Sequence, residues 1–160
     1  MTAEIRLRDV REIDLPLFFE HQMDPTANRM AAFGAEDPAD RGAYRAHGEK
    51  ILGDETVPTK TVLCEGEVAG HIESFERFGK PEVAYWIGRE YWGKGVATRA
   101  LEKFLKVVLV RPLYARAAKD NLASIRVLEK CGFTLSGHDR AYANARGEET
   151  EEVVLELTGT

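Results

Sequence analysis

Two glycines at the start of an apolar-patterned stretch are the residues whose spacing most clearly suggests chemistry. Residues 91–98 read Tyr-Trp-Gly-Lys-Gly-Val-Ala-Thr and run straight into a stretch typical of an amphipathic helix. The first four N–H groups of a helix have no partner within it, and the helix dipole adds partial positive charge there. Glycines at Gly93 and Gly95 let that backbone approach a phosphate closely. The turn therefore predicts a site for a phosphorylated cofactor.

The elements around this turn follow from the hydrophobic pattern. Apolar residues recur at i, i+1, i+4 and i+5 from Val96 to Leu109, which predicts a helix with one buried face. The apolar run Glu82–Ile87 before the turn has the length of a strand and ends at Gly88. The predicted order is strand, loop, glycine turn and helix.

Two known nucleotide motifs do not fit this turn. The dinucleotide fingerprint needs a third glycine where Thr98 stands, and an acidic residue about 20 positions later. A P-loop needs four residues between its glycines, whereas only Lys94 separates Gly93 from Gly95. A turn that merely links strand to helix is the alternative to a cofactor site.

A second block follows the long helix. Leu113–Ala118 is typical of a strand, and residues 119–133 are typical of a short capped helix that ends at Gly132. Asp120 or Asn121 provides the N-cap. For Asn121 and Ser124 the alternative to a functional role is capping and solvation.

Together the two blocks resemble the GNAT superfamily of acetyl-CoA-dependent N-acyltransferases, in particular the branch similar to ribosomal-protein-alanine N-acetyltransferases. The family's turn has the form Gln/Arg-x-x-Gly-x-Gly/Ala, and Trp92–Ala97 occupies it here. Trp92 departs from the first position, but an aromatic residue before Gly-Lys-Gly is common in that branch. The second block, which begins at Asn121, resembles the family's Asn-x-x-Ser/Ala…Lys-x-Gly-Phe. Two linked motifs are more specific than one glycine turn.

The resemblance implies an α/β (α+β) fold, with a single domain over residues 1–160. We expect a central mixed, mostly antiparallel, splayed β-sheet flanked by helices. The hydrophobic pattern adds further elements and two irregular segments that are candidate substrate loops. The expected strands are Ile5–Arg8, Val57–Cys64, Val68–Phe75 and Glu151–Leu157, the expected helices are Leu15–Met23 and Ala39–Leu52, and the irregular segments are Pro25–Asp37 and Arg140–Glu149.

Composition narrows the function. The chain has 160 residues, is 44% hydrophobic and can bury a substantial core. Its 27 acidic and 22 basic residues give a net charge of −5, which argues against general nucleic-acid binding and suits an amine substrate. Cys64 and Cys131 lack metal-ligand spacing, and no apolar run is long enough to span a membrane. We expect a cytoplasmic protein without metal, as a monomer or homodimer.

The resemblance implies acetyl-CoA as co-substrate. The pyrophosphate would bind the backbone N–H groups of the glycine turn, and the pantetheine arm would lie along the splayed strand, whose N–H groups also stabilise the thioester oxyanion. Asn121 would bond the pantetheine arm. The predicted cofactor-binding residues are Tyr85, Trp86, Ile87, Trp92, Gly93, Lys94, Gly95, Val96, Ala97, Thr98, Asn121 and Ser124.

An acetyl transfer also needs a base and an acid. The incoming amine is mostly protonated at neutral pH, so a base must remove its proton; Glu73 and Glu82 are the candidate carboxylates, and His71 is the other titratable candidate. Much of the family protonates the leaving thiolate with a tyrosine where this chain has Leu128. The ribosomal-type branch suggests Ser124 as its substitute.

The sequence thus predicts an N-acetyltransferase that moves the acetyl group of acetyl-CoA to a primary amine by direct attack in a ternary complex. A protein N-terminus or a small amine is the expected acceptor. The alternatives are an acyl-CoA-binding sensor without catalysis, and an acetyltransferase for small molecules such as drugs, polyamines or amino acids.

Overall fold

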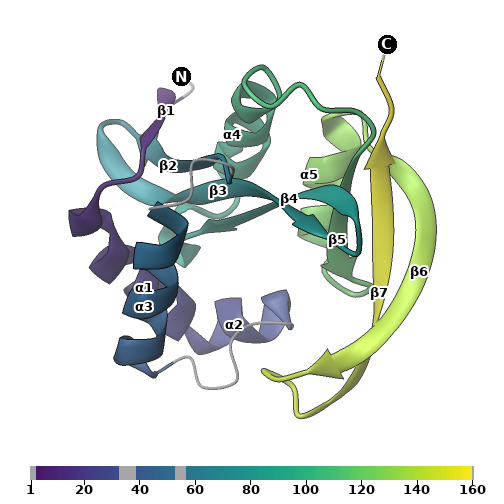
Figure 1. Ribbon diagram of the computed structural model, residues 1–160, viewed down its shortest axis with the longest axis horizontal. Coiled ribbons are helices and arrows are strands. Elements are labelled where there is room, and N and C mark those ends of the chain that lie inside the picture. The colour runs from purple at the N-terminus through teal and green to yellow at the C-terminus, as the bar shows by residue number, and fades with distance from the viewer. Residues whose placement is uncertain (1–2, 33–38, 53–56, 160) are drawn as a thin grey trace.

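A seven-stranded mixed sheet forms the centre of the molecule in our computed structural model, which describes residues 3–32, 39–52 and 57–159. Its strand order is β1-β2-β3-β4-β5-β7-β6 (Figure 1). All neighbours pair antiparallel except β4 and β5. The strands are β1 Ile5–Asp9, β2 Thr59–Cys64, β3 Glu67–Arg77, β4 Lys80–Ile87, β5 Leu113–Ala118, β6 Thr134–Ala143 and β7 Glu148–Leu157.

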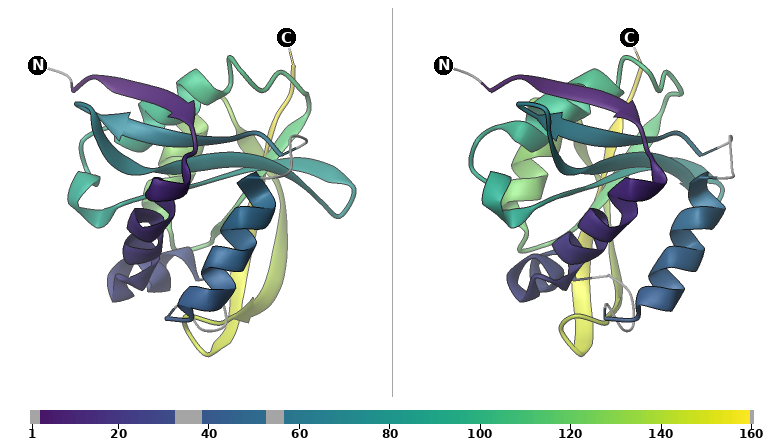
Figure 2. Two further views of the ribbon diagram at one scale, coloured as in Figure 1. Left: turned by 60° about the vertical axis from the view of Figure 1, so that its left-hand side comes forward. Right: turned by 90° about the vertical axis from the view of Figure 1, so that its left-hand side faces the viewer.

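Helices cover both faces of this sheet. Figure 2 shows α1 and α3 on one side and α4 on the other. The packing contacts join α1 to β3 and β4, α2 to β5, and α4 to β1, β3 and β4. The helices are α1 Leu15–Met23, α2 Pro25–Ala31, α3 Arg41–Leu52, α4 Val96–Phe104 and α5 Leu122–Lys130, with short 3-10 turns at Glu12–Asp14 and Arg89–Tyr91.

The main core lies between the sheet and the pair α4 and α5. Leu101 and Phe104 from α4, Leu128 from α5, and Ile72 and Leu113 from the sheet are all fully buried there. Burial of large apolar side chains from both layers is the dominant favourable contribution to folding. This core fixes α4, and therefore the glycine turn before it, against the sheet.

The sheet opens between β4 and β5. A single residue pair, Glu82 with Tyr114, joins these two parallel strands, although they begin side by side. In contrast, β3 pairs with β4 along its whole length, from Gly70 opposite Ile87 to Arg77 opposite Lys80. The two strands therefore diverge beyond Glu82, and the sheet is splayed as predicted.

Ion pairs around Arg116, here called the Arg116 cluster, lie at the closed end of this splay. Arg116 on β5 binds Glu82 on β4 at 3.1 Å, Glu152 on β7 at 2.9 Å and Asp139 on β6 at 2.9 Å. The Phe78 ring lies 5.2 Å from the same guanidinium. One cation therefore connects four strands where β4 and β5 still touch.

Most of the predicted elements are confirmed. Helix α1 has the predicted bounds, Leu15–Met23, and α3 begins two residues later than predicted. The strands before and after residues 65–66, the strand Leu113–Ala118 and the last strand are present, and the helix after Asn121 ends at Lys130. Each of these elements could be predicted because its hydrophobic pattern, cap or turn residues lie within or next to the element itself.

The prediction that the long helix extends to Leu109 is wrong. Helix α4 ends at Phe104, after which Val107 and Val108 donate to the Phe104 carbonyl as a turn. The Arg111 guanidinium binds the carbonyls of Leu105, Val108 and Val110, so these carbonyls accept side-chain bonds. Leu109, predicted to be buried, is 74% exposed.

The expectation of an irregular segment over Pro25–Asp37 is also wrong for its first part. Residues Pro25–Ala31 form α2, because Asp24 caps the backbone N–H groups of Thr26 and Ala27 and proline suits the first helical position. The remainder, residues 33–38, lies outside the described residues. Helix α1 ends at Met23, directly before Asp24, so the N-cap signal of α2 falls where the preceding helix stops.

The second irregular segment, Arg140–Glu149, is largely strand. Strand β6 extends from Thr134 to Ala143 and only residues 144–147 form the turn to β7. Strand β6 is the edge of the sheet, and most of its residues are exposed on both faces. It therefore lacks the apolar alternation from which a strand is predicted.

No helix among the described residues is long and apolar enough to cross a membrane.

Removal of the Arg116 side chain tests whether its cluster holds the sheet together. The substitution Arg116→Ala leaves Glu152, whose side chain is 7% exposed, without its cation, and leaves Glu82, which is 4% exposed, with only the longer contact to Arg77 at 4.0 Å. Buried charges that lose their partner are strongly destabilising, so we expect a loss of about 3–5 kcal/mol in the free energy of unfolding. Urea denaturation would measure it.

Arg140→Ala is the matched control, because its ion pair with Glu151 joins side chains that are 60% and 51% exposed. Exposed pairs contribute little, so the denaturation midpoint should barely change. Equal effects of the two substitutions would contradict the importance of the Arg116 cluster.

Candidate active site

The glycine turn presents backbone donors at the start of α4. Gly93 and Gly95 have φ angles of 76° and 74°, in the left-handed region that glycine adopts without strain. The first α4 residue whose N–H finds a carbonyl is Arg99, which donates to Gly95 at 3.1 Å. The N–H groups of Ala97 and Thr98 precede it and point out of the helix end, so they are available to an anion.

Arg99 also braces this turn, a role that the sequence did not reveal. Its guanidinium donates to the carbonyls of Lys94 at 2.9 Å and Gly95 at 3.2 Å, and to that of Ala3 near the N-terminus. A basic residue in the first turn of a helix opposes the helix dipole, which marks Arg99 as unusual. Its positive charge at the turn adds to the attraction for an anion.

Predicted residues of the turn take different positions. Val96 is 1% exposed and belongs to the core, so only its backbone is open to a ligand. Lys94 is exposed, and Ala97 and Thr98 are partly buried. Trp92 is 40% exposed, and its indole N–H donates to the Ile87 carbonyl at 2.8 Å. Trp92 therefore joins the turn to the end of β4.

Backbone groups of β4 face the splay. Gly88 donates to the Ala69 carbonyl of β3 at 2.8 Å, and bonded residues alternate along an antiparallel pair. Residues 82, 84 and 86 therefore bond to β3, and the backbone groups of Tyr85 and Ile87 point toward β5. The bond from Trp92 to the Ile87 carbonyl agrees with this direction. An extended ligand could pair with β4 here as an added strand does.

Tyr85 and Ser124 meet across the splay. The Tyr85 hydroxyl lies 2.8 Å from Ser124 Oγ, so β4 and α5 share a hydrogen bond at the point where the strands have separated. Burial raises the pKa of Tyr85 to about 12, although the bond to Ser124 opposes this shift. Tyr85 therefore stays protonated. The sequence predicted both residues as cofactor contacts but not their direct bond.

Asn121 occupies the junction between α5 and α2. Its side-chain oxygen accepts from the Ser124 N–H at 3.3 Å, which is the predicted N-cap, and its amide donates to the Met30 carbonyl at 3.3 Å. Leu128, where much of the family has tyrosine, is 1% exposed and packs in the core. The capping alternative is thus real for Asn121, and it fixes the position of Ser124.

The turn between β6 and β7 fastens this junction. Arg146 binds Asp120 through two bonds of 2.8 Å and donates to the Arg29 carbonyl at 3.0 Å. Ala145 donates to the Ala32 carbonyl at 3.2 Å. Three buried alanines, Ala32, Ala118 and Ala143, pack together beside these bonds. Helix α2 is therefore attached to the open end of the splay.

The opposite face of the sheet carries His71 and Glu73. They lie opposite Trp86 and Ala84 of β4, and residues paired in this way share a face. The Phe18 ring of α1 lies 4.6 Å from the His71 ring. The prediction that one strand presents both His71 and Glu73 is confirmed.

Burial sets the protonation of these groups. It raises the pKa of the Glu73 carboxyl above its ordinary value. It lowers the pKa of His71 to about 4, with His21 and His47 as further causes, so His71 is neutral at neutral pH. Burial, followed by the charge of Glu73, raises the pKa of Tyr44 on α3. Glu73 therefore lies in a partly desolvated environment near Tyr44.

Glu82, the other predicted carboxylate, has a different environment. It is 3% exposed and lies in the Arg116 cluster, where Arg116 binds it at 3.1 Å. Its carboxylate is therefore engaged by the Arg116 guanidinium and is not free to face a substrate. The structure therefore separates Glu73 and Glu82 by environment, although both side chains belong to the same face.

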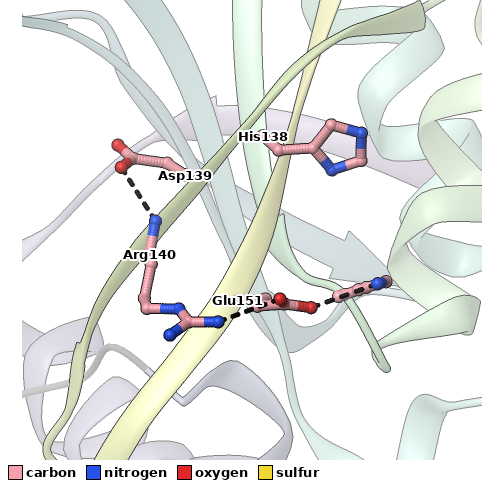
Figure 3. Close-up of a pocket in the computed structure, with 5 residues that line it drawn as sticks. His138, Asp139, Arg140 and Glu151 are labelled. Carbon is pink, nitrogen blue, oxygen red and sulfur yellow. Dashed lines mark hydrogen bonds and ion pairs between the residues drawn. The ribbon is translucent and has the colours of Figure 1, made fainter.

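A surface hollow of about 410 Å³ lies away from these residues, between β6, β7 and the end of β5 (Figure 3). Its charges are paired: Glu151 binds both Arg140 and Lys119 at 3.1 Å, and Asp139 binds Arg116 at 2.9 Å. Three acidic residues of β7, Glu149, Glu151 and Glu152, thus pair with cations of the chain itself. No group of three or more potential metal ligands occurs among the residues that the structure describes.

Comparison with known proteins identifies the family. Residues 4–134 match the family model described as an acetyltransferase (GNAT) domain. The chain is 31% identical over 146 residues to spermidine N(1)-acetyltransferase of Escherichia coli K12, which covers 83% of this chain and 74% of that protein. It is also 32% identical to the uncharacterized N-acetyltransferase p20 of Bacillus licheniformis, over 43% of this chain and 41% of that protein.

Solved structures share the fold. The ribosomal-protein-alanine N-acetyltransferase from Brucella melitensis superposes with a TM-score of 0.80 at 19% identity, over 96% of this chain and 99% of that one. RimL, a ribosomal L7/L12 α-N-protein acetyltransferase in complex with coenzyme A, gives a TM-score of 0.76 at 17% identity, over 96% and 94%.

A splayed sheet with a glycine turn at its open end defines the fold of an acyltransferase. The chain belongs to the GNAT acetyltransferase family, and it is an enzyme of the N-acetyltransferase type.

Substitution of Gly93 by alanine tests the anion site. Gly93 and Gly79 both have a φ of 76° and no atom within 4 Å of an added Cβ, so the two substitutions impose the same backbone strain. Gly93→Ala should raise the KM for acetyl-CoA about tenfold, because its Cβ enters the space beside the donors. Gly79→Ala, in the β3–β4 hairpin, should lower Tm equally without a change in KM. If Gly93→Ala and Gly79→Ala had the same KM for acetyl-CoA, the phosphate would have to bind elsewhere.

Proposed function

We propose that this protein transfers the acetyl group of acetyl-CoA to a primary amine by direct attack in a ternary complex. The observation that carries the proposal is the splay between β4 and β5, which begins at the pair Glu82–Tyr114 and ends beside the glycine turn. One ligand would then reach both the backbone of β4 and the donors before α4.

The donor side supports acetyl-CoA in three parts. The N–H groups around Gly95, Ala97 and Thr98 would bind the pyrophosphate, with Arg99 beside them. The backbone of Tyr85 and Ile87 would bind the pantetheine amides and the thioester oxygen. Trp92, Gly93 and Lys94 complete the turn, and Val96 begins α4. Asn121 lies at the start of α5. No metal enters this proposal.

Glu73 is the base that the electrostatics favour. Burial raises the pKa of the Glu73 carboxyl, and a general base is most effective when its pKa lies near the working pH. Glu82 is bound to Arg116 instead, and His71 holds a proton poorly because its pKa is about 4. We therefore assign the amine proton to Glu73, directly or through water.

Ser124 and Tyr85 form the acid. Ser124 Oγ would donate to the departing sulfur, and the Tyr85 hydroxyl, 2.8 Å away, would donate to Ser124 in turn. A thiol with a pKa near 8.5 is a good leaving group, so a hydrogen-bonded donor of this kind suffices. Tyr85 would thus supply the hydroxyl that Leu128 lacks.

The acceptor is an amine. Spermidine N(1)-acetyltransferase, the relative named above, acts by its name on a polyamine, whereas structural neighbours act on ribosomal proteins. A sensor that binds acyl-CoA without turnover remains the second candidate. Cys64 and Cys131 are both free, which supports a cytoplasmic location, and we expect a monomer or homodimer.

Thiol release in the presence of acetyl-CoA and a panel of amines tests the proposal. Turnover on at least one amine would support the enzyme, and binding without turnover on any would favour the sensor. A thermal melt adds an independent measurement, because a ligand at a hundredfold excess over its Kd stabilises the native state by about 2.7 kcal/mol. If millimolar acetyl-CoA left the melting temperature unchanged, acetyl-CoA would be excluded as the acetyl donor.

The substitution Glu73→Gln should lower kcat about a hundredfold, because the variant lacks the base. The wild-type rate should fall as pH falls through the raised pKa of Glu73, above the usual range of a glutamate, and the variant should lose this limb. The pH dependence of kcat would measure both.

Stability should change in the opposite direction. A carboxyl whose pKa is raised on folding destabilises the native state when it is ionised and not when it is protonated. The melting temperature of Glu73→Gln should therefore be above that of the wild type at about pH 8 and equal to it at about pH 4. A variant that loses activity and stability together would show a structural role instead.

The substitutions Ser124→Ala and Tyr85→Phe test the acid. Each should lower kcat about tenfold with little change in the KM for acetyl-CoA, because a donor to the sulfur acts as charge develops. The double variant should be no slower than the slower single one, since both remove the same path. Asn121→Ala is the control, and it should raise KM more than it lowers kcat. Unaltered turnover in Ser124→Ala would remove Ser124 from the mechanism.

A further inference from the structure

Three buried side-chain nitrogens have no hydrogen-bond partner among the described residues: His21 Nδ1, His71 Nδ1 and Trp86 Nε1. All three belong to the face of the sheet that α1 covers. A neutral histidine nitrogen serves as donor or acceptor according to its tautomer, but an indole nitrogen only donates. Trp86 therefore has a fixed requirement, which is an acceptor oxygen or nitrogen. An unsatisfied buried donor is costly, so such groups usually have a partner in the working state.

Trp86 lies near the C-terminal end of β4, the strand that the proposed function assigns to the acetyl donor. It stands between Tyr85 and Ile87, whose backbone groups face the splay, while its own side chain extends to the opposite face. Its partner in the register is His71, and Glu73 lies opposite Ala84 on the same face. Trp86 therefore belongs to the strand proposed to bind the acetyl donor, and its side chain shares a face with Ala84, the residue opposite the proposed base.

Trp86 Nε1 has no hydrogen-bond partner within the ranges 3–32, 39–52 and 57–159 that the structure describes. His71 is the nearest candidate in the register, yet both His71 Nδ1 and Trp86 Nε1 are without a partner, so they do not bond to each other. Trp92, the other tryptophan, contrasts with this, because its indole N–H is satisfied by the Ile87 carbonyl at 2.8 Å. The two indoles thus have different roles.

We propose that the Trp86 indole N–H selects the acceptor by binding the oxygen of a carbonyl group attached to the carbon that bears the reacting amine, so that α-amino amides are preferred over oligoamines. The proposal rests on the N-acetyltransferase function proposed above and specifies its acceptor. An α-amino amide carries such an oxygen. A protonated oligoamine offers only donors, which leaves the indole without a partner.

The neighbouring groups agree with this class. His71 is neutral, so it adds no cation beside the amine, and its buried Nδ1 has no partner among the described residues. The aromatic Phe18 ring packs on His71. Glu73 supplies a carboxyl for the amine itself. Amine and carbonyl would each then have a partner on the sheet.

Indole resonances in proton–nitrogen NMR spectra test this contact directly, because the chain has two tryptophans and gives two signals. The wild-type protein is saturated with CoA, which prevents turnover, and titrated with alaninamide or with spermidine. Alaninamide should move the Trp86 indole proton downfield, and spermidine should leave it in place. The Trp92 signal, assigned with Trp92→Phe, is the internal reference.

Kinetics test the consequence. Trp86→Phe keeps a flat ring and removes the N–H, so kcat/KM for alaninamide should fall about tenfold and that for spermidine less than twofold. The matched control, Trp92→Phe, removes the other indole N–H and should leave the ratio between the two acceptors unchanged. A purely structural role of Trp86 would lower both acceptors equally.

The outcomes separate this inference from the function on which it rests. A preference for spermidine over alaninamide, an equal loss on both acceptors, or an indole signal that ignores alaninamide would each overturn the role of Trp86, while acetylation of either amine would leave the N-acetyltransferase intact. Acetylation of no amine would overturn both. If Trp86→Phe does not fold, the spectra of the wild-type protein decide.

Discussion

The ion pairs between Arg116 and its carboxylates are the interaction on which the site depends. They hold β4 to β5 at the one place where these strands pair, and they tie β7 and β6 to the same point. Beyond Glu82 and Tyr114 the two strands share no further residue pair. The position of Arg116 thus determines where the sheet opens. The glycine turn, the Tyr85–Ser124 bond and the acceptor face all lie beyond that point.

Alternation along β4 divides the site between two faces. Tyr85 reaches Ser124 and α5, whereas Trp86 lies opposite His71 on the face covered by α1. The backbone between them faces the gap. A single strand therefore separates the donor from the acceptor and presents groups to both, which a helix could not do because its side chains do not alternate between opposite faces. A slip of the β3–β4 register by one residue would exchange the two sets of side chains.

The cofactor side could be predicted from the sequence because its signals are local. Gly93, Gly95 and the cap Asn121 act through their own backbone and near neighbours, so the turn and both helix starts were correct. The Arg116 cluster could not be predicted, since its members are distant in the chain and a lone arginine in a strand has no pattern. For the same reason Glu82 resembled a free carboxylate. The cofactor contacts themselves remain predictions.

A splayed sheet carries a risk of aggregation that other sheets avoid at their interior. Where β4 and β5 part, each presents unpaired backbone groups, and such an edge is a template for a strand of another chain. The indole of Trp92 occupies the carbonyl of Ile87 at the outer end of β4, and so shortens the edge open to a foreign strand. A bound pantetheine arm would cover the rest. The protein would then be most prone to self-association when its donor is scarce, so the supply of acetyl groups would protect solubility as well as drive turnover.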